Sequence, residues 1–178
     1  KDLYNYDSIF VPYGANIKNN NKSNILEKWN LEKNDYILYV GRFVPENAID
    51  ILIKAFKKVN TNKKLIIIGD APYSDEYKKI LHKLASPDKR IIFTGYAFED
   101  DYEQLSTHAY IYVQPAGIDG TRPALLDQMG FGNCVLVRNS KVNMEVIGEC
   151  GIFFDKDNLL NSLTEKIQNL IDDTDLVE

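Results

Sequence analysis

The sequence contains no apolar stretch that approaches the roughly 20 residues required of a membrane-spanning helix. Cysteine and histidine are scarce, with two of each and no CxxC pair, so we expect no zinc site. Basic residues are in the minority: 21 Lys and Arg stand against 26 Asp and Glu, a net charge of -5. Surfaces that bind nucleic acid are usually basic, so no nucleic-acid partner is expected, and binding of this chain alone to anionic lipid is disfavoured.

The few cysteines and histidines have no spacing that suggests chemistry. Cys134 and Cys150 each lie in or beside an apolar run typical of a strand, and we expect two buried free thiols. His82 and His108 are isolated, and we expect them on a helix surface or at a helix end without a catalytic role. The chain begins Lys-Asp-Leu, without a methionine or a visible signal peptide, and is expected to be a fragment of a longer protein.

Short apolar runs alternate with segments of helical periodicity along the whole chain. Strands are predicted over 36–40, 65–68, 91–93, 109–113, 134–137 and 151–154, with a short lead-in strand over 8–12. Helices are predicted over 48–59, 74–85 with Ser74 as the N-cap, 99–107, 122–130, 141–147 and 158–171, and a polar loop over 18–24. Because the strands are nearly all apolar, the sheet should be buried on both faces and therefore parallel. The alternation predicts one α/β domain over residues 1–178, with a doubly wound parallel sheet.

Ligands of doubly wound sheets bind at the carboxyl ends of the strands, where the strand order reverses. Counted from the strand at 36–40, the usual order places the first strand beside the fourth. The loop that begins Gly41-Arg42 should then face the loop over 115–123 across a crevice. Taken alone, Arg42 is as compatible with a surface or ion-paired arginine as with a ligand-binding one.

The loop over 115–123 leads into a helix and has the residues of an anion site. Pro123 fits the first helical turn, which makes Thr121 a candidate N-cap. Gly117 and Gly120 allow the backbone to approach a ligand closely. Free N–H groups at a helix start bind phosphate, and Arg122 adds a positive charge suited to phosphate oxygens.

Two aspartates near this loop are candidates for binding the sugar parts of a ligand. Asp127 shares a helix face with the small residues Gly120, Ala124 and Gly130, which leave room for a ribose. Asp119, on the loop itself, could reach a sugar beyond a diphosphate. A turn or capping role for Asp119, and a solvated helix position for Asp127, are the alternatives.

The ordered motifs along the chain resemble those of the retaining GT-B glycosyltransferases of family 4. They are Tyr-Val-Gly-Arg-Phe-Val-Pro-Glu-Asn (39–47), Ile-Ile-Ile-Gly-Asp-Ala-Pro (66–72), Ile-Phe-Thr-Gly-Tyr (92–96), the segment 119–135, and Glu-Val-Ile-Gly-Glu-Cys-Gly-Ile-Phe-Phe-Asp (145–155). Each motif is weak alone, but the ordered set covers nearly the whole chain. The Gly-Thr-x-Pro-x-Leu-Leu variant, with Val-Pro-Tyr-Gly (11–14), is similar to the bacterial rhamnosyltransferase-like polysaccharide group.

The resemblance implies a Rossmann-like domain, the C-terminal half of a GT-B fold, that binds a nucleoside-diphosphate sugar. The implied roles are the donor diphosphate for Arg42 after Gly41, phosphate binding by the amides of Gly120 and Thr121, the donor sugar for Asp119, the ribose for Asp127, and the base for Tyr96 and Ala97. Two features depart from the family pattern. The diphosphate-binding lysine is replaced by Asn47, for which Arg122 is hypothesised to compensate, and both glutamates of the family are aspartates here.

The implied reaction is retaining transfer of a sugar to a saccharide or lipid-linked acceptor, in surface polysaccharide synthesis. No metal or other cofactor is expected, since arginines and backbone amides would stabilise the departing diphosphate and no Asp-x-Asp loop follows a strand. The acceptor would bind mostly to a missing N-terminal domain. The absence of a targeting segment predicts a cytoplasmic enzyme, with peripheral contact at the inner membrane face open to the full-length protein.

Three other functions are alternatives to a transferase. A GT-B nucleotide-sugar epimerase would need catalytic carboxylates and histidine at positions that the sequence does not supply. A non-catalytic nucleotide-sugar-binding module stays open because of the two aspartates and Asn47. A Rossmann dehydrogenase requires GxGxxG after the first strand, which Gly-Arg-Phe-Val-Pro-Glu does not provide.

Overall fold

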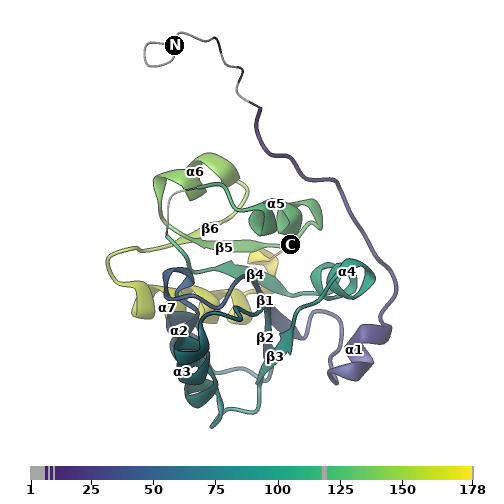
Figure 1. Ribbon diagram of the computed structural model, residues 1–178, viewed down its shortest axis with the longest axis vertical. Coiled ribbons are helices and arrows are strands. Elements are labelled where there is room, and N and C mark those ends of the chain that lie inside the picture. The colour runs from purple at the N-terminus through teal and green to yellow at the C-terminus, as the bar shows by residue number, and fades with distance from the viewer. Residues whose placement is uncertain (1–6, 8, 10, 118–119, 178) are drawn as a thin grey trace.

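The computed structural model describes residues 7, 9, 11–117 and 120–177 (Figure 1). Its centre is a six-stranded sheet in the order β3-β2-β1-β4-β5-β6, in which every pair of neighbours is parallel. The strands are β1 (Tyr36–Val40), β2 (Lys64–Ile68), β3 (Ile91–Gly95), β4 (Ile111–Gln114), β5 (Val135–Arg138) and β6 (Ile152–Phe154). The predicted doubly wound parallel sheet is therefore confirmed, including the placement of the first strand beside the fourth.

Helices cover both faces of the sheet (Figure 1). They are α1 (Asn24–Lys28), α2 (Ile49–Phe56), α3 (Asp75–Ala85), α4 (Glu99–Thr107), α5 (Pro123–Gly130), α6 (Lys141–Ile147) and α7 (Leu159–Asp172), with 3-10 turns at Pro45–Asn47 and Thr174–Leu176. One apolar cluster joins a sheet face to α2, α3 and α7, and a second joins the other face to α1, α4, α5 and α6. Strand β1 contributes to both, because Ile37 and Tyr39 point one way and Tyr36 and Leu38 the other.

The predicted lead-in strand over 8–12 is wrong. Its described residues, Ile9, Val11 and Pro12, belong to no strand and are exposed. The chain after them runs past α5 and α4 toward α1 (Figure 1), with Lys18 N donating to Gly130 O and Asn20 N to Thr107 Oγ1. A run of apolar residues becomes a strand only where another strand supplies ladder hydrogen bonds, which none does here for the described residues.

The segment predicted as a polar loop over 18–24 ends in the first residue of α1, which the sequence did not predict. This helix has only five residues and depends on burial of Ile25 and Leu26 against the second cluster. So short a helix is unstable alone, and tertiary packing rather than local periodicity forms it.

Two smaller predictions had mixed outcomes. Both cysteines are free, but Cys134 is only half-buried and Cys150 is exposed in the turn before β6, so the expected burial of both thiols is wrong. His82 is exposed on α3, and His108 is the C-cap of α4, as expected. Ser74 occupies the N-cap position of α3 but makes no side-chain capping bond.

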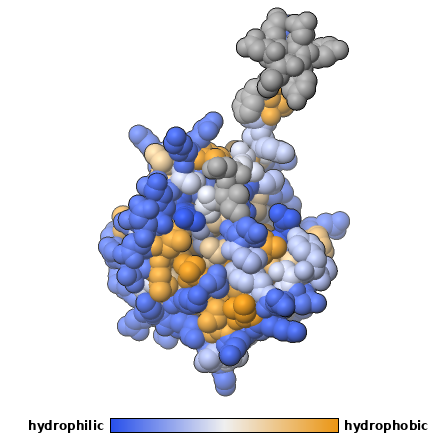
Figure 2. All heavy atoms as spheres, turned by 60° about the vertical axis from the view of Figure 1, so that its left-hand side comes forward, coloured by the Kyte–Doolittle hydropathy of each residue, from blue (hydrophilic) through white to orange (hydrophobic). Residues whose placement is uncertain are grey.

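The surface is mostly polar. Figure 2 shows a face on which hydrophilic residues predominate and apolar atoms gather in separate patches. None of the helices in the described part of the chain is long and apolar enough to span a bilayer.

Candidate functional site

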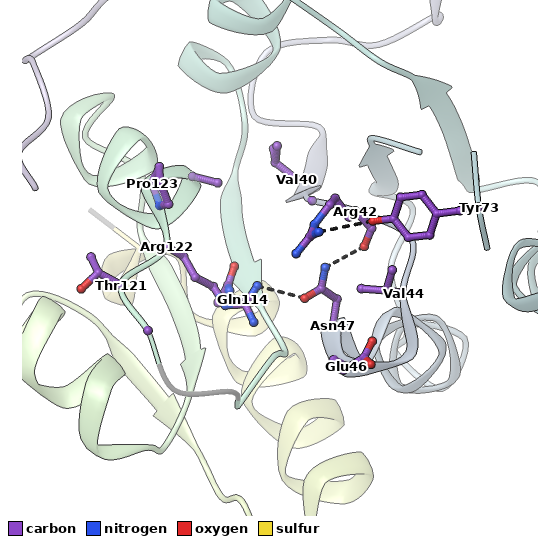
Figure 3. Close-up of a pocket in the computed structure, with 13 residues that line it drawn as sticks. Val40, Arg42, Val44, Glu46, Asn47, Tyr73, Gln114, Thr121, Arg122 and Pro123 are labelled. Atoms are coloured by element: carbon purple, nitrogen blue, oxygen red, sulfur yellow. Dashed lines mark hydrogen bonds between the residues drawn. The ribbon is translucent and has the colours of Figure 1, made fainter. Parts of the chain in front are cut away.

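A hollow of about 640 Å³ lies where the carboxyl ends of β1 and β4 meet, at the predicted crevice (Figure 3). The residues after β1, the 3-10 turn Pro45–Asn47, Tyr73, the end of β4 and residues 120–124 line it. The structure thus brings together Gly41, Arg42, Gly120, Thr121 and Arg122, as the topology argument predicted.

Asn47 links the two sides of this hollow. Its side chain is buried, donates from Nδ2 to the carbonyl oxygen of Arg42 at 2.7 Å, and accepts from Nη1 of Arg122 at 2.9 Å (Figure 3). The guanidinium of Arg122 therefore lies directly against the position at which the family pattern has a lysine. This geometry places a positive charge close to where the lysine's charge is missing.

Arg42 adds a second positive charge on the opposite side of the hollow. Its side chain is exposed, and Nη1 donates to the hydroxyl of Tyr73 at 3.3 Å. Among the described residues, neither Arg42 nor Arg122 forms an ion pair with a carboxylate. Both guanidinium groups are therefore available to an anionic ligand, although the exposed Glu46 also lines the hollow.

The start of α5 differs in one respect from the prediction. The N-cap is Arg122, in extended conformation and without a side-chain cap, and Pro123 is the first helical residue; Thr121 lies one residue earlier. No side chain thus competes with a ligand for the backbone amides of this turn. Gly120 has a φ of +133°, a conformation that other residues rarely adopt, so the backbone here requires glycine.

The two other glycines of the prediction are explained by protein contacts. A Cβ on Gly117 would lie 2.5 Å from Nη1 of Arg138, so this glycine makes room for the arginine at the end of β5, and its role in ligand approach stays a prediction. A Cβ on Gly41 would lie 2.5 Å from the hydroxyl of Tyr39. Gly41 nevertheless lines the hollow, so its backbone is next to any occupant.

A second, mostly apolar hollow of about 350 Å³ adjoins the first and shares Val40, Gly41 and Arg42 with it. Tyr96 and Ala97 line it, so the structure brings them to the site as predicted. The rings of Tyr96 and Phe98 stack with their centroids 5.7 Å apart.

Asp127 lines neither of these two hollows but has a neighbour in each. Ala124, one turn earlier on α5, lines the first hollow. Tyr102 lines the second hollow, and its hydroxyl donates to Oδ2 of Asp127 at 3.5 Å. Burial, followed by the neighbouring Asp127 carboxylate, raises the pKa of Tyr102 to about 12, so this hydroxyl remains a donor at neutral pH. The small face predicted around Asp127 is only partly open, because a Cβ on Gly130 would lie 2.4 Å from the carbonyl oxygen of Asn16.

Asp119 lies outside the described residues, and its predicted contact with a donor sugar stays a prediction. In the described part of the chain, no group of three His, Cys, Asp or Glu residues has the arrangement of a metal site.

The lining residues that were not predicted include Tyr73, Tyr102 and Gln114. Gln114 had a usable signal, because a polar residue at the carboxyl end of a buried parallel strand faces the ligand edge of the sheet. Tyr73 reaches the site from the loop before α3 and Tyr102 from α4. Their place at the site depends on packing, which the sequence does not show.

Comparison with known proteins decides the family. Residues 34–173 match the family model described as glycosyl transferases group 1. The chain belongs to this glycosyltransferase family. Among its relatives, the O-antigen chain mannosyltransferase B of Escherichia coli is 25% identical over 154 residues, which cover 84% of this chain and 40% of the relative. The putative glycosyltransferase YtcC of Bacillus subtilis is 24% identical over 99% of this chain and 45% of its own length. The chain therefore spans less than half the length of these group 1 glycosyltransferases.

Solved structures agree with the glycosyltransferase fold. HepE of Anabaena in complex with UDP superimposes with a TM-score of 0.77 at 20% identity, covering 87% of this chain and 44% of that one. The C-terminal domain of the group 1 protein LpcC from Francisella tularensis has a TM-score of 0.73 at 20% identity, covering 90% of this chain and 87% of that one. The six-stranded parallel sheet is thus the Rossmann-like sheet of GT-B glycosyltransferase structures.

Proposed function

We propose that this chain is the donor-binding domain of a two-domain glycosyltransferase and binds a nucleoside-diphosphate sugar in the crevice between β1 and β4. The observation that carries the proposal is the hydrogen bond from Arg122 to Asn47, which sets one unpaired guanidinium opposite that of Arg42. Two cations and an uncapped helix start around one hollow suit a diphosphate. The UDP bound to HepE and the names of the relatives support the same ligand class.

The adjoining hollow would accommodate the nucleoside. Its apolar lining, with Tyr96 and Ala97 at the rim, suits a base, and Arg42 borders both hollows, as a group that binds the linking phosphates should. Asp127 would accept hydrogen bonds from ribose hydroxyls while Tyr102, which lines the second hollow, donates to one of its oxygens.

The reaction is transfer of the sugar to an acceptor hydroxyl with retention of anomeric configuration. Negative charge develops on the departing diphosphate, and fixed cations and amides that are already in place stabilise it without a metal. Arg42, Arg122 and the backbone at Gly120 and Thr121 supply these groups, and Asp119 would contact the sugar.

The acceptor is a saccharide or lipid-linked saccharide of a surface polysaccharide, bound mainly by an N-terminal domain, and the full-length enzyme works in the cytoplasm or at the inner membrane face. A relative from Campylobacter jejuni, 22% identical over 147 residues, is named for transfer to a diphospho-undecaprenol-linked sugar, which supports this acceptor class. We expect the 178-residue chain alone to bind the donor but to transfer little or no sugar.

The test is to titrate the chain with UDP, GDP and dTDP and to measure binding by calorimetry and by backbone amide NMR. We expect one of them to bind, with shifts at Gly41, Gly120 and Thr121, and Arg122→Ala to weaken binding by roughly 10-fold or more, because a charged hydrogen bond contributes about 1.5–3 kcal/mol. Lys58→Ala is the matched control, since this exposed lysine follows α2 at the opposite edge of the sheet.

The lysine replacement has its own test. If Arg122 replaces the missing lysine, Asn47→Lys should restore affinity in the Arg122→Ala background. Unchanged affinity in Arg122→Ala would refute the compensation, and no binding by any of the three nucleotides would refute the donor site. Sugar transfer by the full-length protein, or its absence despite binding, separates a transferase from a non-catalytic module.

A further inference from the structure

Gln114 is a buried amide at the floor of the first hollow. It is the last residue of β4, its exposed fraction is 2%, and Figure 3 shows its side chain near Arg122 and Asn47. Such a position at the carboxyl end of a central strand is apolar in a sheet buried on both faces, unless the polar group has a partner.

The hydroxyl of Tyr112 bonds to the oxygen of this amide. Tyr112 lies two residues earlier on the same strand, so its side chain points to the same face of the sheet as Gln114. Its ring is fully buried, and its hydroxyl lies 2.6 Å from Oε1 of Gln114. Burial raises the pKa of Tyr112 well above its ordinary value, so the phenol keeps its proton.

The orientation of the carboxamide follows from this contact. A buried O–H group must donate, and Gln114 Oε1 is the only acceptor that the hydroxyl of Tyr112 contacts within the described residues. The oxygen of Gln114 is therefore turned toward Tyr112, and the NH₂ group is turned away from it. The opposite orientation would leave the phenolic proton without an acceptor.

The NH₂ group of Gln114 faces the hollow. In the described part of the chain, Nε2 of Gln114 has no hydrogen-bond partner. Every fully buried side-chain nitrogen or oxygen in that part has a partner, so Nε2 is not fully buried. Nε2 is thus in contact with open space, and the space that Gln114 lines is the hollow between Arg42 and Arg122.

We propose that Gln114 is a ligand-binding residue whose N–H groups donate to a diphosphate oxygen, and that Tyr112 is the positioning residue that holds the amide in this orientation. The proposal rests on the proposed function, because it assigns a further contact within the same donor site. The Gln114 amide adds a neutral donor from the sheet to the guanidinium groups of Arg42 and Arg122. Its N–H groups suit an acceptor oxygen that carries no hydrogen, such as an oxygen of a phosphate.

The experiment uses the 178-residue chain and whichever of UDP, GDP and dTDP binds to it. Gln114→Leu should weaken binding roughly 10-fold or more, the value of one hydrogen bond to a charged acceptor. Gln168→Leu is the matched control: Gln168 is partly buried on α7 and bonds to Asn60 and Asp172, away from the hollow. Thermal unfolding of each variant separates loss of the fold from loss of the contact.

A second measurement observes the Gln114 side chain directly. The Gln114 side-chain ¹H–¹⁵N signals should shift on addition of the nucleotide, whereas those of Gln168 should not. In Tyr112→Phe, which lacks only the hydroxyl, the ligand-induced shift should shrink because the amide is free to turn, and affinity should fall in the same direction as in Gln114→Leu.

The outcomes are distinguishable. Binding by the wild-type chain with an unchanged dissociation constant in Gln114→Leu and unmoved Gln114 signals would overturn this inference and leave the donor site standing. No binding of any nucleotide by the wild-type chain would overturn the proposed function, and this inference with it.

Discussion

At the residue scale, the turn after β1 holds an alanine in a conformation that favours glycine. Ala48 has φ 52° and ψ 36°, and it ends the 3-10 turn that carries Asn47 before α2 begins. A left-handed conformation costs an L-residue with a Cβ roughly 1–2 kcal/mol. The position of Asn47, and with it the contact to Arg122, is thus held at a local energetic cost.

Replacing this alanine by glycine should relieve that cost. We expect Ala48→Gly to raise the free energy of unfolding by about 0.5–1 kcal/mol, since the gained backbone freedom of the unfolded chain offsets part of the relieved strain. The comparison is Ala55→Gly inside α2, where replacing a buried helical alanine should lower the free energy of unfolding by about 1 kcal/mol or more. Chemical denaturation of both variants measures the pair, and a destabilised Ala48→Gly would contradict the assignment of strain.

At the scale of elements, the helix starts near the site differ in how they are capped. Helix α6 has a side-chain cap, because Ser140 Oγ accepts from Asn143 N at 3.3 Å. Helix α5 begins at Pro123, and its N-cap residue Arg122 makes no such bond. Helices α1, α2, α3, α4 and α7 also lack a side-chain cap, so α6 is the exception among the described α-helices. Capping and ligand binding compete for the same amides, so the uncapped start of α5 at the hollow leaves its amides open to a ligand.

Two serines at N-cap positions provide a matched test of this difference. Ser140→Ala should cost about 1 kcal/mol of stability, since it removes a capping bond. Ser74→Ala, at the N-cap of α3, should cost much less because Ser74 makes no side-chain bond to the helix. Equal losses in urea unfolding of the two variants would show that the 3.3 Å contact at Ser140 is not a stabilising cap.

At the scale of the whole molecule, the two ends of the strands differ in function. The hollows lie at the carboxyl ends, while the contacts of Arg90 stabilise the amino end of β3. This arginine bonds to Asp88, at 2.7 Å from Nη2, and to the carbonyl oxygens of Val59 and Thr61, and it lies over the ring of Phe56. The contacts tie β3 to the end of α2.

The ion pair at this edge should make stability depend on pH. The hydrogen bonds from Arg90 hold the pKa of Asp88 below its ordinary value, against the opposing effect of burial. A carboxyl whose pKa is lowered by folding stabilises the protein above its unfolded pKa of about 3.9 and loses that contribution as the pH falls. Asp88→Asn should therefore lower the free energy of unfolding by about 1–2 kcal/mol at pH 7.

The pH profile separates this effect from a simple loss of packing. The difference between Asp88→Asn and the wild type should shrink as the pH falls below about 4. Glu149→Gln, at an exposed position, serves as the control. A difference that stays constant down to pH 2 would mean that the charge of Asp88 is not what stabilises the turn.

The sequence predicted the strands and helices of the sheet to within a few residues, because their periodicity is a local property of the chain. It missed α1 and misplaced a strand at 8–12, where stability depends on contacts rather than on pattern: Ile25 and Leu26 have a core to enter, and Val11 has no neighbouring strand. The site was predicted to the level of its loops. The sequence did not predict the protein contacts of two glycines there, Gly117 with Arg138 and Gly130 with the chain at Asn16.

The sequence by itself determined the parallel sheet, the order of its strands and the crevice between β1 and β4, because short apolar strands joined by helices leave few ways to be buried on both faces. Only the tertiary structure decided which side chains meet in that crevice. Arg122 reaches Asn47 across 75 positions of the chain, and Tyr102 reaches Asp127 across 25. Such contacts depend on side-chain packing between elements, and no short-range pattern of residues encodes them.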